Sequence, residues 1–102
     1  MNDASANVAE EVVVDESPPA GCARIFREIV ALYETSKYDN WTDERLLREP
    51  LEVFNLDSLT LLEYVMTVEE AYGIELNEDD VNRCEAIGDL VKLVAAARNG
   101  RD

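Results

Sequence analysis

Ser58 is the residue whose type and position best support chemistry in this sequence. It follows Asp57 and precedes Leu59, at the predicted start of a helix. Free N–H groups and the positive end of the helix dipole lie there, which suits a covalently attached phosphodiester. The simpler interpretation is that Asp57 or Ser58 only caps the helix, since both residue types are preferred at that position.

The charge around this serine is strongly uneven. No Lys or Arg occurs from residue 57 to residue 80, a stretch that holds eight acids: Asp57, Glu63, Glu69, Glu70, Glu75, Glu78, Asp79 and Asp80. The whole chain carries a net charge of −14. Such a field repels nucleic acid and anionic lipid and favours partners with a basic surface. A solvated acidic face that serves only solubility is the alternative.

Catalysis and metal binding have little support. The chain has no histidine, which excludes Ser-His-Asp and Cys-His catalysis and most zinc sites. The arginines nearest to Ser58 in sequence are poor bases, because a guanidinium does not release its proton. The acids from Glu75 to Glu85 lack the alternating ligands and central glycine of an EF-hand loop. We therefore expect a protein that is not an enzyme and holds no metal.

Hydrophobic spacing predicts helices throughout. A helix over residues 23–36 would turn Ile25, Ile29 and Leu32 inward, with Phe26, Val30 and Tyr33 beside them. The helix over 58–72 would bury Leu61, Val65, Val68 and Tyr72, broadened by Leu62 and Met66, and end at Gly73. Shorter segments over 78–84, capped by Asn77, and 86–97 complete the set. This predicts a small all-α bundle.

The long connection over residues 37–56 contains its own helix signal. Thr42 can cap a short helix whose first turn holds Asp43 and Glu44, and Pro50 would stop it. Trp41 is interpreted as a packing residue of this connection.

Length and composition predict one domain over residues 21–99. Residues 1–20 are acidic, lack Lys and Arg and end in two prolines, so a disordered tail is expected there. Residues 100–102 are expected to fray. The cysteines, Cys22 and Cys84, form no CxxC pair, and no stretch is apolar enough to span a membrane. A cytoplasmic monomer with reduced thiols is the expectation.

The region after Asp57 resembles the second helix of bacterial acyl carrier proteins. The features that carry the resemblance are, in order, Asp57-Ser58-Leu59, Leu62-Glu63, Met66, Glu69-Glu70 and Tyr72. The following segment from Ile74 to Asp80 is similar to the short link and acidic third helix of that family. The resemblance covers residues 22–98 and is strongest over 54–94. It implies a four-helix acyl-carrier bundle, three helices longer and one short, with an extra helical turn in the long first connection.

The resemblance also implies a function and a set of site residues. Ser58 would receive 4′-phosphopantetheine from coenzyme A through a separate phosphopantetheinyl transferase, and Asp57 would bind that transferase or its Mg²⁺. The arm would carry acyl groups as thioesters to basic-surfaced enzymes of fatty-acid, lipid or related biosynthesis. The partner-docking residues would be Leu59, Glu63, Met66 and Glu70. The acyl chain would be sheltered by Leu62, Met66 and Cys84.

Three departures from the family pattern affect the prediction. The acidic tail and the connection from Trp41 to Pro50 look unlike the housekeeping fatty-acid member, which favours a specialised stand-alone bacterial carrier. Asn55 stands where glycine is usual, although asparagine tolerates the left-handed conformation. Glu85 and Ala86 replace the usual Thr or Ser at the start of the last helix. Two alternatives remain open: an acidic helical interaction module without a prosthetic group, and a D-alanyl or aminoacyl carrier. Asp57, where carriers of peptide synthesis usually have histidine, favours acyl or D-alanyl cargo.

Overall fold

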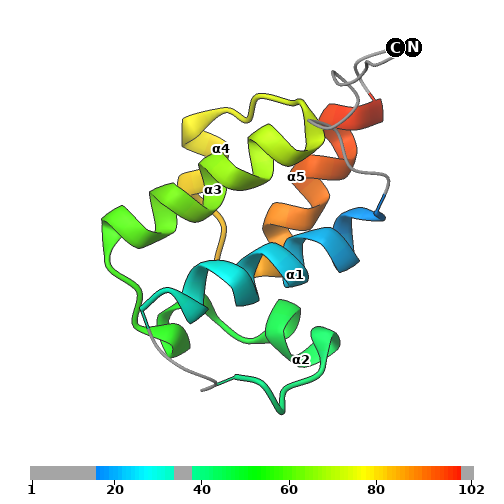
Figure 1. Ribbon diagram of the computed structural model, residues 1–102. Helices are drawn as coiled ribbons and strands as arrows, with labels where there is room; N and C mark the ends of the chain where they lie inside the picture. Colours follow the sequence, from blue (N-terminus) through cyan, green and yellow to red (C-terminus); the bar gives the residue numbers. More distant parts are fainter. Residues whose placement is uncertain (1–15, 34–37, 100–102) are drawn as a thin grey trace, which may run out of the picture.

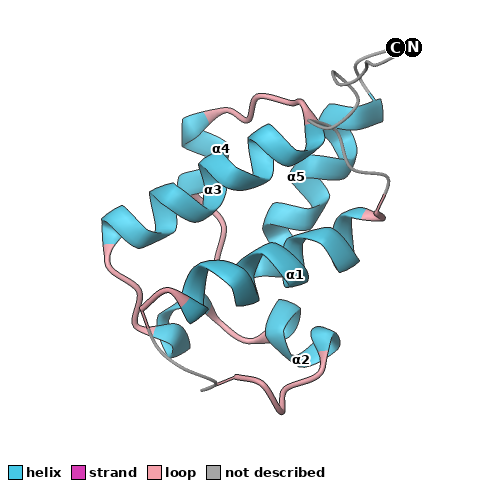
Figure 2. Ribbon diagram, viewed as in Figure 1, coloured by secondary structure: helices cyan, strands magenta, loops and turns pink. Residues whose placement is uncertain are grey.

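The computed structural model describes residues 16–33 and 38–99, and this part of the chain is helical. The elements are α1 (Pro18–Ala31), α2 (Asp43–Arg48), the 3-10 helix η2 (Leu51–Phe54), α3 (Ser58–Tyr72), α4 (Glu78–Asn82) and α5 (Ile87–Asn99). Among these residues no strand forms, only an isolated antiparallel bridge between Pro50 and Ala86 (Figure 2). The all-α prediction is confirmed. The number of helices differs from the expected four, because α2 and η2 both form in the first connection.

Three longer helices, α1, α3 and α5, form the body of the fold (Figure 1). α1 contacts both α3 and α5, and the short α2 packs against α1 and α5. The interior between them is apolar and aromatic, with Phe26, Tyr64, Val68, Ile87 and Val94 at most 1% exposed. None of the helices in the described ranges is long and apolar enough to cross a membrane.

α1 begins and ends earlier than predicted. The prediction was residues 23–36, whereas α1 spans Pro18–Ala31. Pro18 and Pro19 occupy the first turn, where a helix needs no backbone N–H donors. Leu32 and Tyr33, expected to face inward, are 68% and 61% exposed.

The predicted tails lie partly within α1 and partly outside the described residues. Residues 18–20 of the predicted tail over 1–20 belong to α1. Residues 1–15 and 100–102, together with residues 34–37 at the end of the predicted first helix, lie outside the described residues.

Arg27 ties the first connection to α1. Its guanidinium donates to the carbonyl oxygens of Tyr38 (2.9 Å) and Trp41 (2.6 Å) and to the Asp43 carboxylate (2.9 Å). Trp41 packs edge-to-face on Tyr38, with ring centroids 5.0 Å apart, as a packing residue should. The Thr42 hydroxyl accepts a hydrogen bond from the N–H of Arg45, so the predicted cap of α2 is confirmed. The connection is thus held against the bundle and fixes the approach to α3.

The beginnings of α4 and α5 also show how local signals work. The Asn77 side chain accepts from the N–H of Asp80 and caps α4 as predicted, but α4 ends at Asn82 and not at residue 84. At the start of α5 the Asp89 carboxylate accepts from the N–H groups of Glu85 (2.9 Å) and Ala86 (3.2 Å). The Asp89 side chain therefore satisfies the free N–H groups before α5, where no Ser or Thr is present to cap the helix. α5 itself begins at Ile87.

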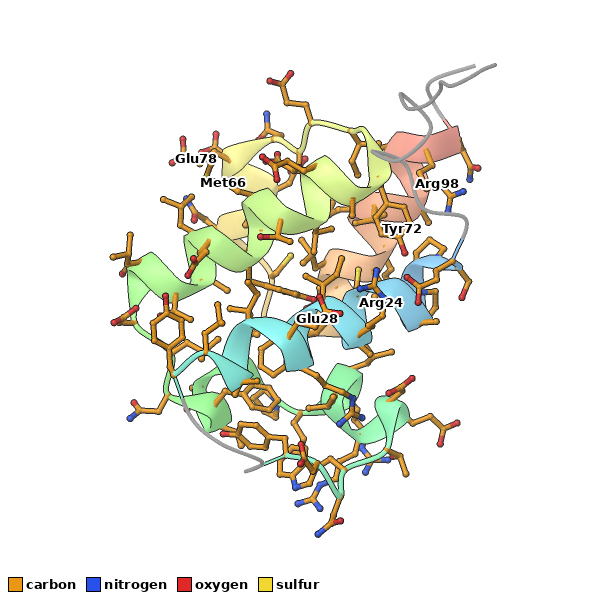
Figure 3. The ribbon with its side chains drawn as sticks, in the orientation of Figure 1. Arg24, Glu28, Met66, Tyr72, Glu78 and Arg98 are labelled. Carbon is orange, nitrogen blue, oxygen red and sulfur yellow. The ribbon has the colours of Figure 1, made fainter. Side chains whose placement is uncertain are left out.

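The start of α1 is held at the opposite end of α3 from Ser58 (Figure 3). The Tyr72 hydroxyl donates to the Ser17 carbonyl (3.0 Å), and Arg24 forms an ion pair with Glu16 (2.7 Å). The Arg98 guanidinium lies 5.2 Å from the centre of the Tyr72 ring. These contacts join α1, α3 and α5 at the Tyr72 end of α3, and none of them involves the end at Ser58.

Candidate functional site

Ser58 is the first residue of α3 and is exposed. The chain reaches it through Asn55, whose φ of 53° is left-handed, as the sequence allowed. Asp57 is the N-cap, and its carboxylate accepts from the N–H of Thr60 at 2.8 Å. The predicted span of this helix is confirmed at both ends, since Gly73 ends it with a φ of 65°. The hydroxyl of Ser58 therefore stands at a helix N-terminus, where a phosphodiester is stabilised by N–H groups and the dipole.

Asp57 keeps a negative charge beside this hydroxyl. The hydrogen bond from the backbone of Thr60 lowers the pKa of Asp57 below its usual value. Oδ1 of Asp57 accepts the capping hydrogen bond from Thr60. Because the residue is exposed, its carboxylate can still contact a cation on a partner. This is compatible with the role expected for Asp57, contact with a basic groove or with Mg²⁺ held by another protein.

An exposed apolar strip follows Ser58 along α3. Leu59 is 73%, Leu62 54% and Met66 50% exposed. Their spacing of three and then four residues places them on one side of the helix. Leu62 and Met66 were expected to broaden the buried face, and that expectation was wrong. Contiguous exposed apolar side chains of this kind mark a contact surface.

Tyr64 takes the buried position that was assigned to Leu62 and Met66, and sequence reasoning missed it. It is 1% exposed, and its hydroxyl donates to the carbonyl of Cys22 at 2.8 Å. The ring packs edge-to-face on Phe26, with centroids 5.4 Å apart. The only signal in the sequence was the spacing of Tyr64 from Val68 by one turn of helix, which the adjacent Glu63 obscured.

The acids of α3 differ in their surroundings. Glu63 accepts a hydrogen bond of 2.7 Å from the Tyr33 hydroxyl, and this bond raises the pKa of Tyr33. Glu70 is exposed seven residues further on, on the same side of the helix as Glu63. Glu69 instead accepts from the backbone N–H of Leu76 at 2.8 Å. The expected docking carboxylates, Glu63 and Glu70, thus lie along one side of the apolar strip, and Tyr33 contacts Glu63 there, which the sequence did not reveal.

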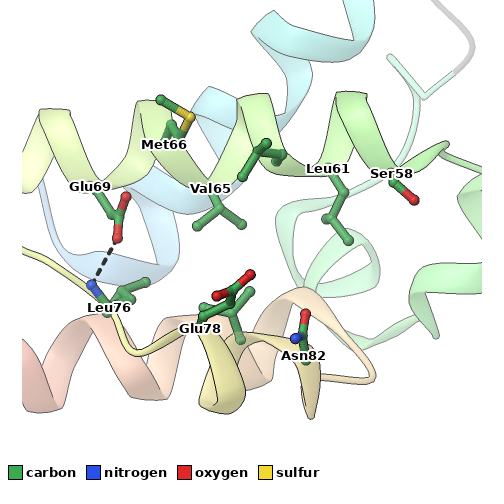
Figure 4. Close-up of a pocket in the computed structure, with 10 residues that line it drawn as sticks. Ser58, Leu61, Val65, Met66, Glu69, Leu76, Glu78 and Asn82 are labelled. Carbon is green, nitrogen blue, oxygen red and sulfur yellow. Dashed lines mark hydrogen bonds between the residues drawn. The ribbon is translucent and has the colours of Figure 1, made fainter.

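A groove of about 440 Å³ begins at Ser58 and runs between α3 and α4 (Figure 4). Two of the three expected cavity residues, Leu62 and Met66, contribute to it. The third, Cys84, lies instead on a cavity of only about 20 Å³ in the interior. The groove lining is mainly apolar, and its members are Ser58, Leu61, Leu62, Val65, Met66, Glu69, Leu76, Glu78, Val81 and Asn82.

These residues fit a 4′-phosphopantetheine group on Ser58. The hydroxyl is exposed for modification, the helix N-terminus suits the phosphate, and the groove beside it offers apolar surface to the rest of the arm. For a metal, the structure offers no group of three or more suitable ligands within residues 16–33 and 38–99.

Comparison with known proteins places this geometry in a family. The family model for the phosphopantetheine attachment site matches residues 39–94, which include Ser58 and the whole groove. An acyl carrier protein of Chlamydia trachomatis serovar D is 39% identical over 49 residues, which are 48% of this chain and 64% of that protein. An acyl carrier protein of Chlamydia muridarum is 37% identical over the same length and the same shares. The matched part thus spans about 64% of the length of these relatives. No solved structure matches the chain.

Proposed function

Because the chain belongs to the phosphopantetheine-attachment family that includes the acyl carrier proteins, we propose that it carries acyl groups on an arm attached to Ser58. The prosthetic group of this family is covalently bound 4′-phosphopantetheine. The observation that carries the proposal is the exposed hydroxyl of Ser58, the first residue of α3, at the mouth of an apolar groove.

In this function the chain is a substrate and a scaffold, and separate enzymes perform the chemistry. Ser58 Oγ would attack the pantetheine-side phosphorus of coenzyme A in a reaction that a transferase catalyses. The pyrophosphate P–O bond would break, adenosine 3′,5′-bisphosphate would leave, and the serine proton would pass to a base of the transferase. The backbone N–H groups at the start of α3 stabilise the attached phosphate. Asp57 holds the helix start in place and presents a negative charge to the transferase. When bound, the arm supplies a thiol that forms thioesters with acyl groups.

The partners we propose are enzymes with basic surfaces, the transferase among them. They would meet α3 through Leu59 and Met66, which are exposed, and through the acids Glu63 and Glu70 along one side of them. Charge would steer the encounter, and the apolar strip would supply the contact area. Fatty-acid, lipid or related biosynthesis in the cytoplasm is the setting we propose for these enzymes.

Intact-mass analysis tests the proposal. The purified chain is incubated with coenzyme A, Mg²⁺ and a broad-specificity phosphopantetheinyl transferase. Wild type should gain one phosphopantetheinyl group and Ser58→Ala none. Ser17→Ala is the matched control, because the Ser17 side chain makes no capping bond and the residue lies at the far end of the fold; it should be modified like wild type.

An unmodified wild type, in a reaction that modifies a known carrier, would reject the proposal. It would favour the second candidate, an acidic interaction module that uses the exposed strip of α3 without a prosthetic group. A D-alanyl or aminoacyl carrier would be modified as well, so the cargo needs a separate argument.

A further inference from the structure

Several hollows adjoin α3, and the groove of about 440 Å³ is the one that Ser58 itself lines. The interior cavity near Cys84 measures about 20 Å³, whereas the groove that begins at Ser58 measures about 440 Å³. Tyr64 lines the interior cavity and blocks its enlargement, because the ring is buried and its hydroxyl is bonded to the Cys22 carbonyl. A cargo attached through Ser58 therefore meets the groove and its lining.

The length of the groove matches the reach of the arm. Ser58 and Glu69 both line it, and eleven residues of helix separate them, or roughly 16 Å at about 1.5 Å per residue. The arm has about as many chain bonds as five amino-acid residues, so it extends roughly 17 Å at about 3.4 Å per residue. An arm that follows α3 from Ser58 thus brings its acyl group to the part of the groove near Glu69.

Two carboxylates line the groove, Glu69 from α3 and Glu78 from α4, and the Asn82 amide lies nearer to the Ser58 end (Figure 4). The Glu69 carboxylate is held there by its bond from the Leu76 N–H (2.8 Å). Figure 4 shows the Glu78 carboxylate and the Asn82 amide pointing from α4 into the space below α3. Among the described residues that line the groove there is no Lys or Arg. Carboxylates in an otherwise apolar wall attract a cation or a hydrogen-bond donor and repel an anion.

We propose, on the premise that Ser58 carries the arm, that Glu69 and Glu78 select the cargo. The groove favours short acyl groups that bear an amino group at their far end, accepts those with a hydroxyl group less strongly, and rejects those with a free carboxylate. Apolar surface from Val65, Met66 and Val81 contacts the methylene part of the same acyl group. The selectivity lies in the carrier itself, before any partner enzyme acts.

Four acyl groups with the same three-carbon chain and different ends test this order of preference. The chain is loaded at Ser58 from the coenzyme A thioesters of 3-aminopropionate, 3-hydroxypropionate, propionate and malonate, and intact mass verifies each product. Thermal melts of the loaded proteins at pH 7 and low salt are then compared. The 3-aminopropionyl form should melt roughly 2–4 °C above the propionyl form, as expected for a partly exposed ion pair in a domain of this size. The malonyl form should melt below it.

Variants and amide chemical shifts locate the effect. Glu69→Gln combined with Glu78→Gln should remove the spread between the amino and malonyl forms, because both amides keep the shape and lose the charge. Glu75→Gln is the matched control, since Glu75 is exposed and lies outside the groove; the spread should persist. In wild type, exchanging propionyl for 3-aminopropionyl should shift the backbone amides of residues 69, 78 and 82 more than those of α1.

The failures of the two proposals are distinct. If no thioester loads, the carrier function itself is rejected. If all four load and melt within error of one another, or if the spread survives in the double variant, the carrier function stands and the selectivity inference is overturned.

Discussion

Reversing the charges of two carboxylates beside the apolar strip of α3, half-buried Glu63 and exposed Glu70, is expected to slow modification of Ser58. The variant is Glu63→Lys combined with Glu70→Lys. Each replacement changes the charge by +2, so the net charge goes from −14 to −10. Both acids lie away from the buried face of α3, so the fold should persist.

The size of the expected fall in rate follows from how far the two side chains contact solvent, Glu70 being exposed and Glu63 half-buried. An exposed ion pair contributes about 0.2–1 kcal/mol. Losing two such pairs and replacing them with repulsions should cost about 1–3 kcal/mol of the interaction with a basic partner. That is roughly a 5- to 100-fold lower rate at limiting carrier concentration. Glu63 starts with a bond from Tyr33, which a partner's Lys or Arg must displace, so Glu70 should account for the larger share.

The assay is the initial rate of mass gain with a phosphopantetheinyl transferase, at low salt and at roughly 0.5 M salt. The difference should shrink at high salt, where screening acts within a few ångströms. Glu44→Lys combined with Glu85→Lys has the same net charge but changes exposed acids outside α3, and it is the control. Equal rates for the two double variants at low salt would show that total charge matters and that α3 is not the docking surface.

Three further predictions concern the frame that holds Ser58. Tyr64→Phe removes the buried bond to the Cys22 carbonyl and should cost about 1–2 kcal/mol, a fall of roughly 5–10 °C in a thermal melt; an unchanged midpoint would contradict the assigned bond. Gly21→Ala should destabilise the folded state by about 1–3 kcal/mol in spite of a helix-propensity gain of about 1 kcal/mol, because the new Cβ would overlap the Tyr72 hydroxyl. Gly88→Ala should cost less in the same melts, because its Cβ would meet only the Leu47 carbonyl oxygen, at 3.1 Å. Burial raises the pKa of Cys22 to about 11, so the folded state keeps a proton that the unfolded state releases. The melting midpoint should therefore fall as pH rises from about 9 towards 11. Cys22→Ala should flatten this fall between about pH 9 and 10, and an equally steep fall in the variant would assign the effect to other groups.

The helix that begins at Ser58 was predictable because its limits depend on local chemistry. Asp57 caps it with its own side chain, Asn55 takes the left-handed turn, and Gly73 takes the left-handed position after the last turn. Each signal acts within a few residues along the chain, so one sequence is enough to place it. The exposed position of Ser58 follows from the same contacts.

The prediction failed where distant contacts decide. The spacing of Ile25, Ile29 and Leu32 fits helices with more than one starting residue. The helix that starts at Pro18 places Ser17 and Gly21 against Tyr72, a contact distant in sequence. The hydroxyl of buried Tyr64 donates a hydrogen bond to a carbonyl 42 residues away. The spacing of Tyr64 from Val68 hints at the burial, but no pattern within α3 reveals the distant acceptor. Cys84 lines the small interior cavity and not the groove beside Ser58, a distinction that its position in the sequence does not make.

The division of labour between the two faces of α3 explains why an apolar strip can stay exposed. Stability comes from the other side, where Phe26 packs on Phe54 and Tyr64 with centroids 4.8 and 5.4 Å apart. Burying Leu59 would add about 1.5–3 kcal/mol, a large fraction of the stability of a small domain, yet the fold leaves it in water. The neighbouring acids keep such a surface from associating with itself, since two copies repel each other. The proposed function would require such a surface, because a carrier would bind its basic partners in turn and be released by each.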